Sequence, residues 1–488
     1  MLNLFERGKM GLMAEKQGKQ NLLPTIFVVL GATGDLMRRK LTPGLFHLYK
    51  TGHLPSLFQV IGFSKDAYTQ ESFREMVAGI VKEKVRGADP AGIEQFRRFF
   101  VYQQGLFEEN EGYQNMATFL GQKDGEWKVC ANKLFYIAAS PQFYETIFRK
   151  LASSGLTKPC SPEEGWTRVI VEKPFGKDLQ TAQKLDELLG KLFREEQIYR
   201  IDHYLGKETV QNILAFRFSN SFLDPAWNRD GIERIHIQLW EKEEIGDRGG
   251  FYDGIGALRD VGQSHVLQLL ALFCMGNPGT FEADQVRKKR AAILRSLKIW
   301  KGQEVEGQTL RGQYEGYLLE KGVDQNSKTE TYFRIQTRIE GKLWEGVPII
   351  LESGKAMPED RVEVTVTFRH PIPCLCPADR HYQNVLRYRV EPKEGIRISF
   401  LVKKPGPAMI LEEKDFIFDY KEAFGEEQIA DAYERLLLSV IRGDQTLFVS
   451  TEEIMAEWEF VDPIVRAWQN NLVPLQRYRK NTMSLPLG

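Results

Sequence analysis

The chain has 488 residues, which is too long for one ordinary hydrophobic core, so we expect two or three domains. Hydrophobic residues make up 42% and charged residues 27%, which is typical of a globular protein in water. Lysine plus arginine and aspartate plus glutamate both total 66, so the net charge is zero and we expect no nucleic-acid partner.

The N-terminal residues 1–23 carry Glu6 and Glu15 and lack an apolar run of signal-peptide length. We expect them to form a mobile extension, with Met10 or Met13 as alternative starts. No stretch of the chain reaches the ~18 consecutive apolar residues of a membrane span, so we expect no membrane partner.

Residues 24–205 alternate between strand and helix patterns. The apolar run Thr25–Leu30 predicts a strand buried on both faces, as in a parallel sheet. Thr42 and Pro43 predict the cap and first turn of a helix that follows it. Further strands are predicted at residues 58–63, 134–139 and 168–172, with helical sequence between them. This alternation predicts a Rossmann-like α/β domain that binds a dinucleotide.

Residues 206–488 have a different pattern. Helical sequence near 207–218 and 258–275 is interleaved with long stretches of apolar–polar alternation. The alternation is clearest at residues 232–239, 362–368 and 396–401. It predicts strands with one packed face. We therefore expect a dinucleotide-type domain followed by a larger α+β domain with an antiparallel sheet.

The first predicted strand runs directly into a glycine turn. Gly31 and Gly34 allow close approach of the backbone, and the start of the next helix offers N–H groups to a pyrophosphate. The spacing is G-x-x-G, with Leu36 where a third glycine would stand. The glycine turn alone is weak evidence for a dinucleotide-binding site. Its position after the first strand strengthens that evidence.

The end of the second predicted strand bears on the choice of cofactor. An acid there would bind the ribose hydroxyls of NAD, whereas a cation would bind the 2′-phosphate of NADP. The chain has Ser64, Lys65 and Asp66 side by side. Ser64 and Lys65 favour NADP, and Asp66 leaves NAD as an alternative.

The five cysteines are odd in number and scattered, which favours reduced structural thiols and a cytoplasmic location. Cys374 and Cys376 have no second ligand pair at finger-like spacing, so we expect no metal site.

The nonamer RIDHYLGKE, residues 200–208, gathers an acid, an imidazole, a phenol and an ammonium: Asp202, His203, Tyr204 and Lys207. A polar segment of this length is more often a solvated loop than a site. What favours a site is the set of blocks around it. They occur in one order, as GATGDL (31–36), VEKPFG (171–176), RIDHYLGKE (200–208), WNRDGIERIHI (227–237), DRGGFYD (247–253), RDVGQSH (259–265), SGKA (353–356) and DAYERLLL (431–438).

With these blocks, the chain from about residue 25 to 470 resembles the glucose-6-phosphate dehydrogenase family. The resemblance implies a Rossmann-like coenzyme domain followed by a β+α domain with a large, mainly antiparallel sheet, residues 206–488, which binds the substrate and forms the oligomer. It also implies oxidation of glucose 6-phosphate at C1 to the 6-phosphoglucono-δ-lactone, with hydride transfer to NAD(P)+, the first step of the oxidative pentose phosphate pathway. Family members form dimers and tetramers through the large sheet, so we expect a homodimer or homotetramer.

The resemblance also assigns roles to single residues. His265 is implied as the catalytic base, since histidine titrates near neutral pH, and Asp202 as the carboxylate that orients it. Donors to the dianionic phosphate would be His203, Tyr204 and Lys207. The remaining implied substrate-binding residues are Lys173, Glu241, Asp260 and Lys355. The implied cofactor-binding residues are Gly31, Thr33, Gly34, Asp35, Leu36, Ser64, Lys65, Tyr136, Lys173 and Pro174.

The chain departs from the family pattern at three places. Many members have arginine where this chain has Lys65, which lacks the bidentate fork. Asp360 stands where a second substrate-binding cation is common, and Arg361 is the alternative cation. The aromatic C-terminal ending of members with a second, structural NADP is absent, so we do not predict that site.

The resemblance also places Lys173 where substrate and nicotinamide meet, before a proline that is often cis.

Two rival functions remain open from the sequence. One is a catalytically silent relative that binds dinucleotide or sugar phosphate as a regulator. The other keeps the chemistry and changes the sugar, to a related aldose phosphate or free glucose.

Overall fold

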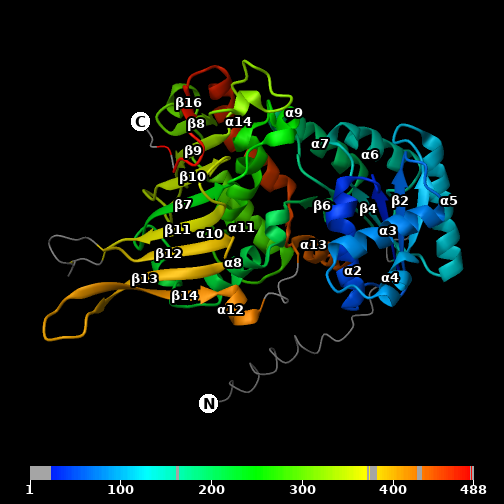
Figure 1. The fold of residues 1–488 in the computed structure, drawn as a ribbon, viewed down its shortest axis with the longest axis horizontal. Helices are drawn as coiled ribbons and strands as arrows, with labels where there is room; N and C mark the ends of the chain where they lie inside the picture. Colours follow the sequence, from blue (N-terminus) through cyan, green and yellow to red (C-terminus); the bar gives the residue numbers. More distant parts are fainter. Residues whose placement is uncertain are drawn as a thin grey trace, which may run out of the picture. The chain divides into compact units, whose positions relative to one another are not determined.

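The computed structural model describes residues 23–160, 164–370, 373, 382–425, 431–483 and 485. Two predictions fall on residues outside these ranges. They concern residues 1–22 of the N-terminal extension, and Cys374 and Cys376. The chain forms two compact units (Figure 1). The first unit comprises Met1–Pro174, Leu185–Ile201 and Asp431–Phe448, and the second comprises Phe175–Lys184, Asp202–Ala430 and Val449–Gly488.

The first unit is built on a parallel sheet. Among the described residues seven strands join in the order β15-β6-β5-β4-β1-β2-β3. They are β1 (Thr25–Leu30), β2 (Phe58–Ser64), β3 (Phe100–Gln104), β4 (Asn132–Ile137), β5 (Thr167–Val171), β6 (Ile198–Ile201) and β15 (Phe448–Val449). Strands β1 to β6 pair in parallel, and β1, β2 and β4 are buried along their whole length. The predicted Rossmann-like fold is confirmed, although β3 and β6 were not among the predicted strands.

Helices connect these strands. They are α2 (Thr42–Lys50), α3 (Gln70–Lys84), α4 (Pro90–Arg97), α5 (Asn110–Trp127), α6 (Tyr144–Ser153), α7 (Leu179–Leu192) and α13 (Ala432–Arg442). Pro43 lies in the first turn of α2 as predicted, but Thr42 is not a cap. The π-helix η1 (Met37–Leu41) runs directly into α2, so the backbone is already helical before Thr42.

The segment Asp431–Phe448 returns to the first unit, which the division in chain order did not foresee. Its helix α13 packs on α2, where Gly44 lies against Leu437. Arg168 of β5 donates to the carbonyl oxygens of Val440 (2.5 Å) and Ile441 (3.1 Å). The return is therefore held by both apolar packing and buried hydrogen bonds.

The second unit contains the large sheet. Its described residues form nine strands in the order β14-β13-β12-β11-β7-β10-β9-β8-β16. They are β7 (Ile232–Trp240), β8 (Thr309–Tyr314), β9 (Tyr332–Thr337), β10 (Ile349–Gly354), β11 (Arg361–Phe368), β12 (Val385–Glu391), β13 (Gly395–Lys403), β14 (Leu411–Asp419) and β16 (Leu475–Tyr478). The pairs β7–β10 and β8–β16 are parallel and the other pairs are antiparallel. The predicted mainly antiparallel sheet is confirmed.

Helices pack against this sheet. They are α8 (Glu208–Phe218), α9 (Gly249–Tyr252), α10 (Leu267–Cys274), α11 (Ala283–Arg295), α12 (Tyr420–Phe424) and α14 (Thr451–Gln469). The predicted helix over 258–275 begins as a π-helix, η7 (Leu258–Val266), which contacts β7 and β10 and continues into α10. Such wide turns are frequent at functional sites.

The prediction of reduced thiols is wrong for Cys130 and Cys160, which form a disulfide with their Cα atoms 6.1 Å apart. Cys130 follows α5 and Cys160 follows α6, so the fold brings together residues that are 30 positions apart in the sequence. Cys274 is buried and reduced, and burial raises the pKa of its thiol to about 12. The cysteine pattern thus no longer supports a reducing compartment.

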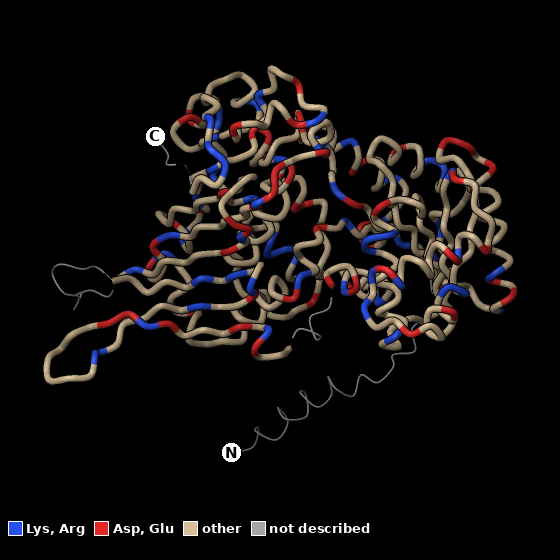
Figure 2. The backbone as a smooth tube through the Cα atoms, in the orientation of Figure 1, with Lys and Arg blue, Asp and Glu red and all other residues tan. Residues whose placement is uncertain are grey.

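Positive and negative residues are interspersed along both units, in keeping with their equal totals (Figure 2). Among the described helices, none combines the length and apolar character needed to cross a bilayer.

Candidate active site

His265 and Asp202 form a buried pair in the second unit. His265 Nδ1 lies 2.5 Å from Asp202 Oδ1, and the two residues are 2% and 1% exposed. Since an ionised carboxylate only accepts hydrogen bonds, Nδ1 carries the proton and the basic lone pair of the ring is on Nε2. The structure thus brings the predicted base and its predicted partner together.

Local structure fixes both members of the pair. Asp202 caps the 3₁₀ turn η4 (His203–Gly206), where its Oδ1 also accepts the backbone N–H of Tyr204 at 3.0 Å. His265 lies near the end of η7, and Gly262 lets this helix approach the sheet. A Cβ at Gly262 would lie 2.9 Å from the ring of Phe333 in β9.

Two aromatic rings from η4 pack against the His265 imidazole. The ring of Tyr204 stacks on it with centroids 4.1 Å apart and an interplanar angle of 24°. The ring of His203 meets it edge-on at 4.7 Å. The imidazole is therefore held in orientation by packing as well as by Asp202.

Two of the three predicted phosphate ligands, Tyr204 and Lys207, bind a carboxylate that sequence reasoning missed. The Tyr204 hydroxyl donates to Glu391 Oε1 at 3.0 Å, and Lys207 Nζ forms an ion pair with Glu391 Oε2. Burial and the Glu391 charge raise the pKa of Tyr204 well above its ordinary value, so its hydroxyl remains a donor. Glu391 ends β12 before Pro392 and belongs to no recognisable motif, so the sequence carried no signal for it.

Glu241 and Lys355 meet because of the sheet register. Parallel strands β7 and β10 pair Trp240 with Gly354, so the residues that follow them leave the same edge of the sheet. Their side chains form an ion pair, and Lys355 Nζ lies 5.9 Å from the Tyr252 ring centroid.

Asp260 belongs to the same neighbourhood. Burial raises the pKa of Tyr252 well above its ordinary value, and the charges of Asp260 and Glu241 raise it further. Glu241 also raises the pKa of Tyr204. The predicted residues of the second unit thus form one polar cluster around His265.

Arg361, the alternative to the substrate-binding cation that Asp360 replaces, contacts other residues of the protein. Asp360 Oδ1 accepts the backbone N–H of Lys242 at 2.8 Å. Arg361 forms an ion pair with Glu359 and lies over the Trp240 ring, 4.6 Å from its centroid.

A buried acid, Glu457 of α14, braces the helix that carries His265. The side-chain amides of Gln263 and Gln268 donate to its two oxygens at 2.9 and 2.7 Å. They stand on either side of His265 in the sequence. Burial raises the pKa of Glu457 well above its ordinary value, with the nearby charges of Glu453 and Asp202 adding to the shift.

A second buried acid, Glu330, anchors the start of η7. Its Oε1 accepts the backbone N–H of Leu258 at 3.1 Å. Desolvation raises its pKa from 4.5 to about 6, although its own backbone amide, the Leu258 N–H, Arg259 and Arg311 favour the charged form.

The raised pKa of Glu330 predicts a pH-dependent effect on stability. Since the folded state disfavours the ionised carboxylate, the contribution of Glu330 falls as pH rises from about 4.5 through about 6. We expect Glu330→Gln, which does not titrate, to gain about 2 kcal/mol over wild type between pH 4.5 and pH 7.5. Denaturant unfolding of both proteins at the two pH values measures this. The exposed Glu306→Gln is the control, and an equal difference at both pH values would contradict the assignment.

The first unit holds the predicted dinucleotide loop. Gly31 has φ +102°, and a Cβ there would lie 2.4 Å from the Ala138 carbonyl oxygen after β4. The loop lies at the carboxyl ends of β1 and β4, where the strand order reverses and α/β sheets bind ligands. Helical backbone begins at Asp35, so the N–H groups of a helix start face this position, as a pyrophosphate requires.

The residues at the end of β2 have distinct environments. Thr33 Oγ1 lies 2.8 Å from Ser64 Oγ and 2.5 Å from Asp66 Oδ2, so the Asp66 carboxylate is bonded within the glycine loop. Lys65 is exposed, and its carbonyl oxygen accepts a hydrogen bond from Gln104. The acid is thus engaged by the protein, whereas the cation is accessible to a ligand.

Tyr136 and Lys173 are connected through Glu172, which precedes Lys173 in the sequence. Tyr136 is fully buried on β4, and its hydroxyl donates to Glu172 Oε1, which also accepts the Tyr433 hydroxyl at 3.2 Å. The Lys173–Pro174 peptide bond is cis, as the resemblance implied.

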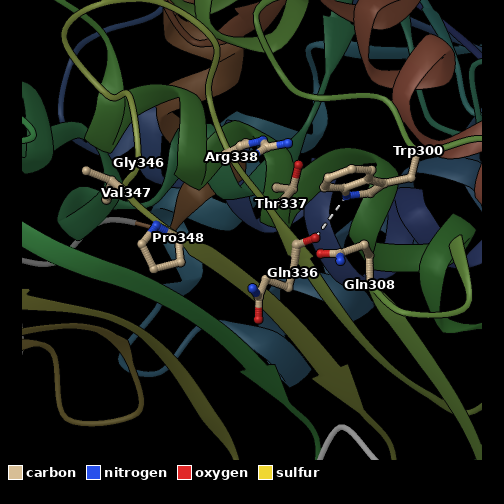
Figure 3. A pocket seen from close by; sticks show the side chains of 8 residues that line it. All are labelled: Trp300, Gln308, Gln336, Thr337, Arg338, Gly346, Val347 and Pro348. Atoms are coloured by element: carbon tan, nitrogen blue, oxygen red, sulfur yellow. Dashed lines mark hydrogen bonds between the residues drawn. The ribbon is translucent and has the colours of Figure 1, made fainter. Parts of the chain in front are cut away.

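A separate recess of about 510 Å³ in the second unit contains none of the predicted residues (Figure 3). It is lined by Trp300, Gln308, Gln336, Thr337, Arg338, Gly346, Val347 and Pro348. The Trp300 indole N–H donates to the Gln336 carbonyl oxygen, so its polar atom is already engaged. The recess lies where β9 ends and β10 begins, whereas Lys355 follows the other end of β10.

Comparisons with known proteins cover nearly the whole chain. The glucose-6-phosphate dehydrogenase NAD-binding domain matches residues 28–212, and the C-terminal domain of the same family matches residues 214–485. The chain is 39% identical to glucose-6-phosphate 1-dehydrogenase of Aggregatibacter actinomycetemcomitans, over 90% of both chains. It is 35% identical to the cytoplasmic glucose-6-phosphate 1-dehydrogenase 5 of Arabidopsis thaliana, over 93% of this chain and 88% of that one.

Solved structures agree with these sequence matches. A glucose-6-phosphate dehydrogenase in complex with glucose 6-phosphate superposes with a TM-score of 0.88 and 32% identity, over 96% of this chain and 97% of the other. Since both domain families and both kinds of comparison converge, the chain belongs to the glucose-6-phosphate dehydrogenase family.

Proposed function

We propose that this protein oxidises D-glucose 6-phosphate at C1 to 6-phospho-D-glucono-1,5-lactone. The observation that carries the proposal is the buried Asp202–His265 pair within a cluster of phosphate and hydroxyl ligands. The superposed relative is in complex with glucose 6-phosphate, which is its substrate.

His265 and Asp202 supply the base for this reaction. His265 Nε2 takes the proton of the C1 hydroxyl while the C1–H bond breaks, so that the C1–O bond becomes a carbonyl. Asp202 keeps the tautomer that leaves Nε2 basic and stabilises the imidazolium that forms. Bound NAD(P)+ supplies the acceptor for the hydride, which carries both electrons of the broken bond.

The other residues bind and orient the sugar phosphate. His203, Tyr204 and Lys207 donate to the phosphate, and Lys173 and Lys355 are further donors to the substrate. The carboxylates Glu241 and Asp260 accept hydrogen bonds from the sugar hydroxyls. Binding both ends of the substrate places C1 relative to the base.

The phosphate contacts discriminate between glucose 6-phosphate and free glucose. Losing charge-assisted hydrogen bonds to a dianion removes several kcal/mol of binding, so we expect kcat/KM for free glucose to fall by at least about 10³-fold. Initial rates of nicotinamide reduction with the two sugars measure this. Equal kcat/KM values would favour the alternative of another sugar substrate, and no turnover with intact cofactor binding would favour a silent regulator.

For the cofactor we propose NADP+, with NAD+ as a weaker alternative. The glycine turn at Gly31 and Gly34 and the helix start at Asp35 and Leu36 would hold the pyrophosphate. Ser64 and the exposed Lys65 would bind the 2′-phosphate, while Thr33 keeps Asp66 engaged. Lys173 and Pro174 would lie beside the nicotinamide, and the buried Tyr136 would act by fixing Glu172.

Lys65→Ala tests this choice. We expect KM for NADP+ to rise about tenfold and KM for NAD+ to change little, because only NADP+ carries the 2′-phosphate. Side-by-side titration of both cofactors measures it, with the exposed Lys82→Ala on α3 as control. Equal increases for both cofactors would show that Lys65 does not read the 2′-phosphate.

We also propose that the chain forms a homodimer or homotetramer through β14 and the turn before it. This β14 surface exposes Met409, Ile410, Phe416 and Ile417, the last two at 64% and 63%. In Figure 1 the hairpin of β13 and β14, in orange, extends past the neighbouring strands of its sheet. Apolar side chains on an edge strand are a usual site of association.

Ile417→Glu should dissociate the oligomer, since a charge would be buried in the interface. Light scattering after size exclusion should give a multiple of 56.2 kDa for wild type and 56.2 kDa for the variant. Leu319→Glu, at another exposed apolar position of the second unit, is the control. An unchanged mass for Ile417→Glu would show that association uses a different surface.

A cytoplasmic location is proposed on the likeness to the Arabidopsis relative.

A further inference from the structure

In this structure two of the three donors proposed for the substrate phosphate, Tyr204 and Lys207, hold an anion that belongs to the protein itself. The Glu391 carboxylate accepts the Tyr204 hydroxyl at 3.0 Å on Oε1 and pairs with Lys207 Nζ through Oε2. Each carboxylate oxygen thus occupies one donor. A phosphate would need the same two donors, because both groups are anionic oxygen acceptors.

The position of Glu391 is fixed by the strand and helix around it. Glu391 ends β12 and pairs with Val362 of β11. Thr209 of α8 donates from its hydroxyl to the Val390 carbonyl oxygen at 3.2 Å, and its own carbonyl oxygen accepts the Tyr388 hydroxyl at 2.7 Å. These bonds dock the start of α8 on β12 and place Lys207, the residue before α8, against Glu391.

The ion pair is accessible to a ligand. The Lys207 and Glu391 side chains are 21% and 36% exposed, so water reaches both of them. A pair of this kind contributes little stability, because solvent screens it. The negative charge of Glu391, however, opposes a second anion at the same donors. Phosphate binding must therefore displace the Glu391 carboxylate or share Lys207 with it.

We propose that Glu391 is an internal competitor for the substrate phosphate, which lowers the affinity of this site for phosphate groups. The inference rests on the proposed function. Because Glu391 lowers the affinity of the phosphate donors, a free phosphate ion binds weakly. A sugar phosphate binds well, since it also engages Glu241, Asp260 and Lys355 through its hydroxyls. Glu391 thereby weakens the binding of both ligands by a similar factor.

Glu391→Gln tests the proposal, because it removes the charge and keeps an acceptor oxygen. We expect KM for glucose 6-phosphate to fall about fivefold, with the change in KM rather than in kcat. The inhibition constant of inorganic phosphate against glucose 6-phosphate should fall by a similar factor. KM for free glucose, which has no phosphate, should not improve. The exposed Glu306→Gln of the same unit is the matched charge control.

An unchanged or higher KM for glucose 6-phosphate in Glu391→Gln would overturn the proposal, because Glu391 would then be inert or would hold Lys207 in place for the substrate. Glu391→Ala, which removes the acceptor as well, should shift the inhibition constant in the same direction. Calorimetric titration of each variant with inorganic phosphate needs no turnover. It therefore separates failure of this inference, in which Glu391→Gln binds phosphate no more tightly, from failure of the proposed function, in which wild type does not turn over.

Discussion

His265→Asn is expected to lower kcat by about 10²–10⁴-fold, the usual contribution of a positioned general base. Asparagine has no basic atom at neutral pH, so the C1 hydroxyl proton has no acceptor when the hydride leaves. The substrate ligands are untouched, so KM for glucose 6-phosphate should change little. Steady-state kinetics measure both parameters, with the exposed His53→Asn as control. Values near wild type would show that another residue is the base.

Asp202→Asn is expected to cause a loss in kcat on the order of 10²–10⁴-fold with the dyad geometry preserved. The amide oxygen can still cap η4 by accepting the Tyr204 N–H. The same oxygen position faces His265 Nδ1, so that hydrogen bond is kept as well, but the negative charge that stabilises the imidazolium is lost. The base would then remain in position, but its protonated form in the transition state would be less stable.

The comparison of Asp202→Asn with Asp230→Asn, an exposed carboxylate of the same unit, separates this effect from a general change of charge. The thermal midpoint of Asp202→Asn should stay near wild type, since η4 keeps its cap. A variant that retains full kcat would show that the negative charge of the carboxylate is dispensable for the base. One that loses kcat together with its fold would show a structural role instead.

The strands were predicted well where burial fixes the residue type. The apolar run Thr25–Leu30 coincides with β1, because a strand covered on both faces tolerates only apolar side chains. Alternation over 362–368 falls within β11, and that over 232–239 falls within β7. Neither β3 nor β6 was predicted. The apolar pattern of β3 is weakened by its position at the edge of the sheet, and that of β6 by its short length.

The candidate site was predicted as a set of residues and not as a geometry. The sequence around His265 predicted a helix, and the structure shows a π-helix there. The type of helix was not predicted, because nine residues leave no periodic signature of the wide π-helical turns. The meeting of Glu241 and Lys355 depends on the register of β7 and β10, which no local pattern states. Glu391 and the Cys130–Cys160 disulfide were missed for the same reason, since both depend on long-range contacts.

The central claim is hydride transfer from C1 of glucose 6-phosphate to a nicotinamide. The most direct test is turnover of glucose 6-phosphate that carries deuterium at C1, followed by mass spectrometry of the reduced cofactor. The predicted result is one deuterium in each reduced nicotinamide, with a slower rate than for the unlabelled sugar if C–H cleavage limits turnover. Reduced cofactor without deuterium, or no reduction at all with both ligands bound, would contradict it.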